Sequence, residues 1–184
     1  MRKNFGAKTY LYPQAVMIIA TYDENGNVDA MNAAWGGICG SNKVMIDLGK
    51  HKTTDNISKT NAFTVGIGDK DNVVACDYVG IVSANNEPEK MKKSGFTTVK
   101  SDFVNAPIIN ELPLTLECEL EKIVDGSMYI GNIVNVSCDE KYLGEDGEPD
   151  LSKFKPITFD PVHHKYIALG EEVGNAFSDG NKIK

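Results

Sequence analysis

Apolar residues in the first part of the chain recur in short runs that are typical of β-strands. Residues 15–22 form a continuous apolar and β-branched run, and an Asn-Gly turn at 25–26 follows it closely. An Asn-Gly pair after such a run favours a tight β-hairpin. Further strand-like runs occupy 43–48 and 62–67. The chain is therefore expected to open with a hairpin and to continue mainly as β-sheet.

Short helices are expected between these strands and after them. The segment 53–57 is rich in hydroxyl groups and has the composition of a helix start. Apolar positions within 71–79 are spaced for a short helix, and 87–95 has Pro in its first turn and Gly at its end. We interpret the last two segments as short connecting helices.

The second half of the chain returns to strand patterns. Residues 114–120 alternate apolar and polar positions, and an Asp-Gly turn leads from them into 129–136. This arrangement predicts a second long hairpin. A polar segment at 139–155 is interpreted as a loop, because strand-like residues at 157–159 and 166–169 still follow it.

These elements predict one mostly β domain over residues 1–184. About six strands with few long helices suit a closed antiparallel β-barrel, in which interior and exterior side chains alternate. A β-sandwich is the competing arrangement. With 184 residues and a hydrophobic fraction of 41%, the chain is large enough to bury a core without disulfides or metals.

Charge and cysteine content narrow the function classes. The formal net charge of −7 and the pI near 5.0 disfavour binding to nucleic acid or to an anionic membrane surface. No apolar run approaches the roughly 20 residues that span a bilayer, and the first residues lack the apolar stretch of a signal peptide. The cysteines are far apart, so we expect a reduced, cytoplasmic protein.

Two segments carry the candidate chemistry. Residues 29–37 form a small-residue run that contains the only Trp, Trp35, and would let a flat ring approach the backbone. Lys52, Thr53 and Thr54 lie at the expected helix start, where hydroxyls, backbone N–H groups and a cation suit a phosphate. Together the two segments indicate a site for a planar, phosphorylated cofactor such as flavin mononucleotide (FMN).

Each candidate also has a structural explanation. Threonines often cap helices, and Trp35 with the glycines after it would equally fill a core and mark a bend at a barrel corner. Cys39 is better explained as a small buried hydrophobe than as a redox centre. The adjacent His163 and His164 diverge and lack a third ligand at typical spacing, so no metal site is predicted. No Gly-x-Ser-x-Gly segment supports a hydrolase.

Four segments, taken in order, resemble the flavin-reductase-like FMN-binding split-barrel family, most closely its flavoredoxin members. They are 29–37, 53–57, 77–83 and 166–170, and the resemblance spans residues 10–180. It implies a homodimer of six-stranded antiparallel split β-barrels that binds FMN noncovalently near the subunit interface. It also implies an oxidoreductase of the flavin reductase type, with electrons passing from NADH, NADPH or a redox protein through FMN to an acceptor.

The resemblance carries site residues over position by position. Lys90 falls where the family has a Lys that would stabilise negative charge on the reduced ring, with Lys92 and Lys93 as alternatives if the register slips. A solvated helix face is the other explanation for these lysines. The full set is Asn32, Ala33, Ala34 and Trp35 along the ring and ribityl chain, Lys52, Thr53, Thr54 and Asn56 at the phosphate, and Ser83, Lys90 and Tyr166 close to the cofactor.

Two positions depart from the family pattern. Met128 stands where many flavoredoxin-like chains have a His, so a proton relay through that imidazole is not carried over. Lys52 replaces an Arg of some relatives, which keeps the charge but loses bidentate geometry. No Gly-x-Gly-x-x-Gly segment follows a strand, so a nicotinamide is expected to bind transiently over the flavin.

Two other functions fit the same sequence. One is a nonenzymatic flavin-binding or electron-carrier module. The other is a barrel that has lost its cofactor and serves as an interaction domain. Reduction of the FMN-loaded protein by a nicotinamide distinguishes the enzyme from the carrier. Failure to be reconstituted with FMN distinguishes the interaction domain from both.

Overall fold

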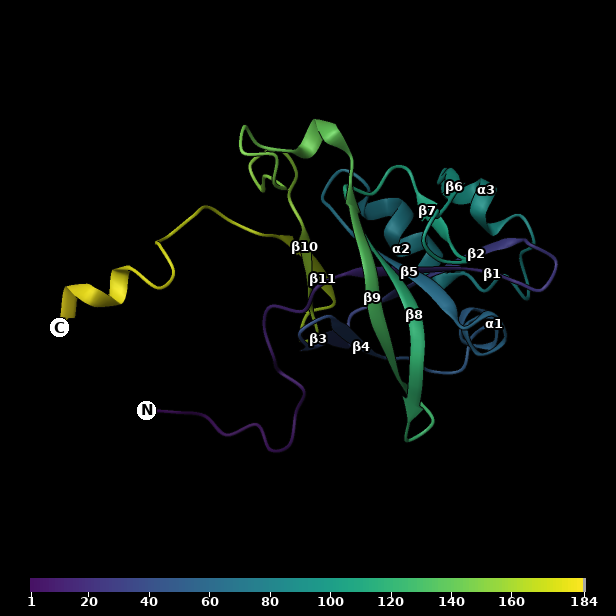
Figure 1. The fold of residues 1–184 in the computed structure, drawn as a ribbon. Coiled ribbons are helices and arrows are strands. Elements are labelled where there is room, and N and C mark those ends of the chain that lie inside the picture. The colour runs from purple at the N-terminus through teal and green to yellow at the C-terminus, as the bar shows by residue number, and fades with distance from the viewer. Residues whose placement is uncertain (184) are drawn as a thin grey trace.

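The computed structural model describes residues 1–183, and its main feature is a curled, antiparallel seven-stranded sheet (Figure 1). In their order across the sheet the strands are β2 (Val28–Ala33), β1 (Met17–Tyr22), β5 (Ala62–Ile67), β8 (Leu114–Val124), β9 (Met128–Cys138), β4 (Lys43–Asp47) and β3 (Gly36–Gly40). Two small sheets pair β10 (Ile157–Asp160) with β11 (Lys165–Ala168) and β6 (Thr98–Lys100) with β7 (Pro107–Ile109).

The helices of the described chain are short and connect the strands. They are α1 (Lys52–Thr60), α2 (Val73–Ile81) and α3 (Lys90–Ser94), with 3-10 turns η1 (Glu140–Tyr142) and η2 (Asp179–Ile183). Each α-helix overlaps a segment for which the sequence predicts one. Within residues 1–183, none of the helices has the length and apolar character needed to cross a membrane.

Both predicted hairpins are present, and turn chemistry explains them. β1 and β2 pair antiparallel with Ala20 opposite Ala30, and Gly26 in the turn between them has a φ of +81°. β8 and β9 are joined through Asp125 and Gly126, which have φ values of +50° and +76°. Glycine takes such left-handed angles without steric cost, and Asp tolerates them better than most residues.

The predicted mostly β, antiparallel split-barrel fold is confirmed, and the sheet differs in two respects from the closed barrel of about six strands that the strand pattern alone suggests. It has seven strands, and in the described residues β2 and β3 remain as its edges. The additional strand β3 was not predicted, because its sequence Gly-Gly-Ile-Cys-Gly shows no strand periodicity. The hairpin of β6 and β7 was missed because each strand has only three residues.

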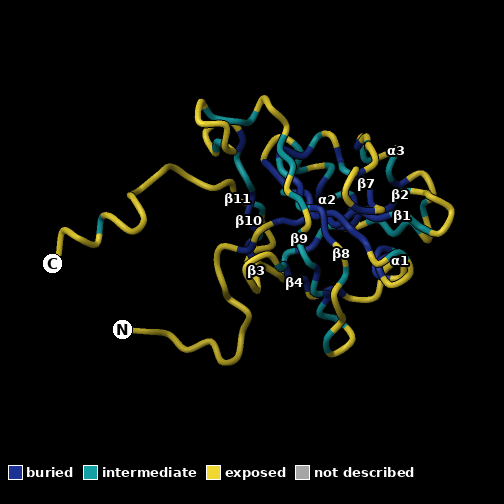
Figure 2. The backbone as a smooth tube through the Cα atoms, viewed as in Figure 1, coloured by how far each residue is buried: buried dark blue, intermediate teal, exposed yellow. Residues whose placement is uncertain are grey.

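The core lies on both faces of the sheet. Along β1, Ile19 joins a cluster with Phe63 and with Ile57 of α1, whereas Ile18 joins a second cluster with Val79 of α2. Successive side chains of a strand point to opposite faces, so a strand covered on both sides is apolar at every position. This explains the continuous apolar run in the sequence, and Figure 2 shows these strands as the buried centre of the fold.

The two chain ends are the most exposed parts of the fold. Residues 1–13 and 167–178 are exposed, and both ends extend from the same side of the sheet (Figures 1 and 2). The N-terminal segment is anchored where it meets β10, because the Gln14 backbone N–H donates to Thr158 Oγ1 at 2.8 Å. The hydroxyl of Tyr12 donates to Asp160 beside it.

Candidate functional site

A cavity of about 320 Å³ lies where five parts of the chain meet. Its walls come from the end of β2 and the residues after it, the segment between β4 and α1, α2, β10 and β11. Three aromatic side chains form one wall. The Trp35 and Phe159 ring centroids are 5.8 Å apart, and those of Phe159 and Tyr166 are 6.1 Å apart. Ala33 and Ala34 add only small side chains to the lining.

A second cavity, of about 100 Å³, adjoins the first. The two share His51, Met31 and the Gly80–Ile81 turn of α2 as lining residues. Lys52 and Ser83 line the second cavity alone. The two neighbouring cavities, together called the depression, therefore have an aromatic end and an end that carries cations and hydroxyl groups.

Asp29 of β2 links α1 and α3 in the wall of the second cavity. Its side chain is 2% exposed, and both carboxylate oxygens are bonded to side chains from other elements. Thr53 Oγ1 of α1 donates to Oδ2 at 2.7 Å, and Lys90 Nζ of α3 lies 3.2 Å from Oδ1. Lys90 is 3% exposed, so the ion pair is sealed from water. Its two charges offset each other in the wall of the cavity.

A hydrogen-bond network crosses the wall of the first cavity. Asn32 Nδ2 donates to the Cys76 carbonyl at 3.0 Å and to the Tyr166 hydroxyl at 3.3 Å. That hydroxyl in turn donates to Asp77 Oδ1 at 2.7 Å. Burial, together with this hydrogen bond to Asp77, raises the pKa of Tyr166 above its ordinary value. The phenol therefore keeps its proton throughout the neutral range.

The first turn of α1 ends in the second cavity. Thr54 Oγ1 accepts a hydrogen bond from the His51 backbone N–H at 2.9 Å and closes this end of the helix. Lys52 Nζ lies 3.5 Å from Asp23 Oδ2 and keeps 29% of its side chain exposed. The backbone N–H groups of a first helical turn have no partner within the helix, and the helix dipole adds partial positive charge there. This end of the depression suits an anion.

The structure brings most of the predicted site residues together. Lys90 lies in the lining of the second cavity rather than beside the aromatic wall, and its charge is paired with Asp29. The exposed Lys92 and Lys93 pair with Glu89 and Glu87 and line neither cavity. The first cavity is lined by Asn32, Ala33, Ala34, Trp35 and Tyr166, and the second by Lys52, Thr53, Ser83 and Lys90.

Thr54 and Asn56 line neither cavity. Thr54 serves the helix start, and Asn56 Nδ2 donates to Thr21 Oγ1 of β1 at 3.0 Å. Both side chains are buried. Their contacts tie α1 to itself and to the sheet, so both side chains fix the position of the helix.

Three further residues, His51, Asp77 and Phe159, belong to the site although no sequence pattern assigned them to it. His51 lines both cavities, and Asp77 and Phe159 line the first. The segment that contains Asp77 carried part of the resemblance, but its contact with Tyr166 spans 89 residues and leaves no local pattern. Met128 stands opposite Asp47 in the sheet, next to the first cavity but outside its lining.

The adjacent histidines have separate partners. His163 Nδ1 lies 2.8 Å from Asp160 Oδ2, and the His164 ring stacks on Phe159 with centroids 6.2 Å apart. The hydrogen bond from Tyr12, followed by that from His163, holds the pKa of Asp160 well below its usual range. These contacts fix the turn between β10 and β11 behind the aromatic wall.

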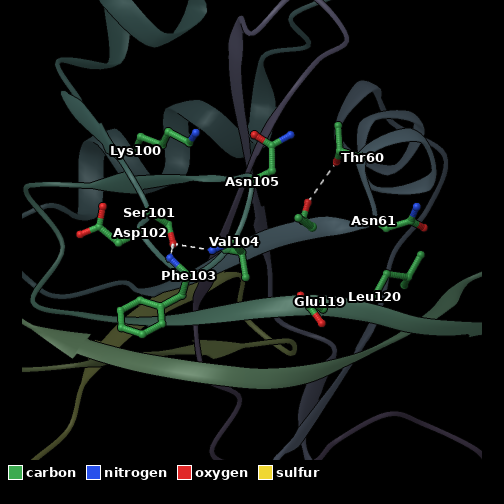
Figure 3. Close-up of a pocket in the computed structure, with 11 residues that line it drawn as sticks. Thr60, Asn61, Lys100, Ser101, Asp102, Phe103, Val104, Asn105, Glu119 and Leu120 are labelled. Atoms are coloured by element: carbon green, nitrogen blue, oxygen red, sulfur yellow. Dashed lines mark hydrogen bonds between the residues drawn. The ribbon is translucent and has the colours of Figure 1, made fainter.

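Two larger hollows lie elsewhere. One, of about 520 Å³, lies between the end of α1 and the 101–105 loop, with Phe103 on the loop side and Asn61 on the helix side (Figure 3). The other, of about 930 Å³, lies between the 144–155 loop and residues 169–172. Neither contains a predicted site residue, and six of the thirteen residues that line the second are carboxylates. Size alone therefore does not identify the site.

Cys76 and Cys118 are expected to resist thiol reagents in the folded protein. Both are fully buried, and burial raises the pKa of each thiol to about 12. Only the thiolate is reactive, so neither should be alkylated by iodoacetamide at pH 8. Mass spectrometry of the native protein checks this, with the denatured protein as the positive control. Rapid native labelling of Cys76 would show that α2 does not cover the sheet as described.

Comparisons with known proteins agree on one family and one fold. The family described as "Flavin reductase like domain" matches residues 9–160. Flavoredoxin of Desulfovibrio vulgaris (Miyazaki F) is 38% identical, with a TM-score of 0.93 over 98% of this chain and 100% of that chain. Flavoredoxin from Methanosarcina acetivorans is 21% identical, with a TM-score of 0.89 over the whole of both chains.

A third solved structure has the same fold at lower identity. The FMN-binding protein from Thermus thermophilus is 16% identical to this chain, with a TM-score of 0.76 over 95% of this chain and 97% of that one. At this identity the likeness concerns the fold alone. The family match contains every residue that lines the second cavity and all but Tyr166 of those that line the first.

Proposed function

Because the chain belongs to the flavin reductase-like family, we propose that it is an FMN-binding oxidoreductase that passes electrons from NADH, NADPH or a redox protein to an acceptor. The family resemblance predicted from the sequence is confirmed. The observation that carries the proposal is the junction of two cavities, in which an aromatic end meets a cationic, hydroxyl-rich end. A ligand that is flat at one end and anionic at the other fits this arrangement.

The residues of the first cavity fit the ring of FMN. The volume of about 320 Å³ is at the lower end of the range for small-molecule sites. Trp35 and Tyr166 offer aromatic surface, and the small side chains of Ala33 and Ala34 leave the backbone accessible. Asn32 adds a polar group to the same wall. Apolar walls with a few polar groups are the usual composition of such a site.

The residues of the second cavity fit the phosphate. Lys52 and Ser83 supply a cation and a hydroxyl, and the first turn of α1 supplies backbone N–H groups. The Thr53 hydroxyl is already bonded to Asp29, so we assign it a supporting role. Asp29 does not repel an anion because its charge is offset by Lys90.

Bound FMN supplies the hydride and single-electron chemistry. The chain contributes binding, orientation and control of access. Trp35 is 42% exposed at the mouth of the first cavity, which leaves an approach for an electron donor or acceptor. Tyr166 and Asp77 keep a protonated phenol in the wall. A nicotinamide would approach transiently over the ring, because the chain has no Gly-x-Gly-x-x-Gly segment to hold it.

Reduction of the loaded protein tests the enzymatic function. We expect purified protein reconstituted with FMN to be bleached by NADH or NADPH on a catalytic timescale, as measured by stopped-flow absorbance. Bleaching by a reduced redox protein but by neither nicotinamide would favour the electron-carrier function. A protein that does not bind FMN at all would refute the proposal and favour an interaction domain.

We also propose a homodimer formed at the open edge of the sheet beside the site. All five residues of β3 are exposed, including Ile38 at 68%, and both chain ends carry exposed apolar residues such as Leu11 and Phe177. Unpaired sheet edges and exposed apolar surface favour association. Light scattering is expected to give twice the chain mass, with Cys39 of β3 becoming more reactive on dilution. A monomeric mass at all concentrations would contradict this.

A further inference from the structure

The hydrogen bonds around Asn32 determine which end of its amide group faces the first cavity. A carbonyl oxygen can only accept, so the Cys76 carbonyl must face the NH₂ group of Asn32. The Asp77 carboxylate accepts the Tyr166 proton, which leaves the phenol oxygen to accept from that same NH₂ group. Both donors of the Asn32 amide are therefore in use, and flipping it would break both bonds.

The amide oxygen of Asn32 is left as a free acceptor. Within residues 1–183, Asn32 Oδ1 has no hydrogen-bond partner, and it is not among the buried unpaired atoms, which belong to Gln14, Asp69 and Ser137. The oxygen is therefore accessible. Since Asn32 lines the first cavity, this is the open space that it reaches.

Helix α2 holds the side chain in place. Cys76 and Asp77 belong to the same helix as Gly80, and a Cβ at Gly80 would lie only 2.8 Å from the Cβ of Asn32. The backbone of α2 therefore rests against Asn32 and leaves no room for the side chain to swing toward the helix. One short helix supplies the carbonyl, the carboxylate and the close contact that fix a single orientation.

We propose that Asp77 and Tyr166 are positioning residues that point the amide oxygen of Asn32 into the cavity, where it accepts a hydrogen bond from the imide N–H of the flavin ring. This inference rests on the proposed function, because it names a recognition element of the same site. It assigns Asn32 a role in specificity: the site selects a flat ring with a donor at this edge and rejects a ring that lacks one.

A flavin that cannot donate tests this assignment without changing the protein. A methyl group on the imide nitrogen of FMN removes the donor and leaves the ring and phosphate intact. Loss of one such hydrogen bond, with the acceptor left unpaired, is expected to weaken binding about tenfold. Dissociation constants for FMN and 3-methyl-FMN are measured by fluorescence titration, and their ratio is the readout.

Three variants locate the selectivity. Asn32→Leu removes the acceptor and is expected to bring the ratio close to one. Tyr166→Phe removes one of the two bonds that orient the amide and is expected to lower the ratio to about threefold, since one orienting bond remains. Tyr142→Phe, which deletes a hydroxyl from the 139–155 segment, is the matched control and should keep the wild-type ratio. A purely structural role for Tyr166 would change both affinities alike and leave the ratio unchanged.

The outcomes separate this inference from the proposed function. Equal binding of FMN and 3-methyl-FMN by the wild-type protein would overturn the inference and leave the proposed function intact. If Asn32→Leu keeps the wild-type ratio of the two dissociation constants, the role of Asn32 is overturned. If Tyr166→Phe keeps that ratio, the role of Tyr166 is overturned. Failure of the wild-type protein to bind either flavin would overturn the inference and the proposed function together.

Discussion

Replacing Lys90 with Met is expected to lower the free energy of unfolding by about 3–5 kcal/mol. The reason is that Lys90 Nζ is the cation beside Asp29, and the two side chains are only 4% and 2% exposed. Met keeps the apolar stem of Lys but leaves a carboxylate buried without a counter-charge. Urea denaturation followed by circular dichroism measures the loss.

Two further variants show whether the buried charge is the cause. Asp29→Asn combined with Lys90→Met removes both charges and should recover much of the lost stability, because an uncharged pair avoids the desolvation cost. Lys92→Met removes a lysine from the same helix whose side chain is 77% exposed and pairs with Glu89 at 3.0 Å. Exposed pairs contribute about 0–1 kcal/mol, so the change should be small. Equal losses for Lys90→Met and Lys92→Met would contradict a sealed ion pair.

Replacing Lys52 with Ala is expected to weaken FMN binding about tenfold to a hundredfold and to leave riboflavin binding unchanged. Only FMN carries the phosphate, and a charge-assisted hydrogen bond contributes about 1.5–3 kcal/mol. Lys52 suits this test because its pairing with Asp23, at 3.5 Å, is loose and its side chain is part exposed. Fluorescence titration with the two flavins gives the affinity ratio directly.

Thr53 is a poorer choice for the same experiment, because replacing it would also remove a hydrogen bond to buried Asp29. Lys59→Ala is the matched control for Lys52→Ala. It removes the same charge from the last turn of α1, where Lys59 is 53% exposed and bonded to Glu24. We expect it to affect neither flavin. A loss that is equal for FMN and riboflavin in Lys52→Ala would place the phosphate elsewhere.

The fold was predictable wherever local chemistry determines it. The glycines at 26 and 126 predict both hairpins, because few residues other than glycine tolerate the positive φ angles of these turns. The strand β3 was not predictable from its glycine-rich sequence, because it is a strand only through its pairing with β4. The open edges of the sheet agree with the split barrel that the family resemblance implies, but the strand pattern alone suggested a closed one, because closure depends on how distant strands meet and not on the pattern within any one of them.

The site was predictable as segments but not as contacts. The runs around Trp35 and Lys52 suggest a ring and a phosphate from their own residue types. The pairing of Asp29 with Lys90 joins residues 61 positions apart, and the bond from Tyr166 to Asp77 joins residues 89 apart. Such bonds depend on tertiary packing, so the family resemblance alone suggested Lys90 for the site, close to the ring, and no sequence pattern assigned Asp77 to it.

The use of both Asp29 oxygens has a consequence for how related sequences can diverge. One oxygen is committed to Thr53 and the other to Lys90, so a change at position 29, 53 or 90 disturbs the remaining two. A neutral side chain at position 90 is tolerable only if the acid at position 29 is lost with it. The three positions should therefore be inherited as a linked set, although they are far apart in the chain.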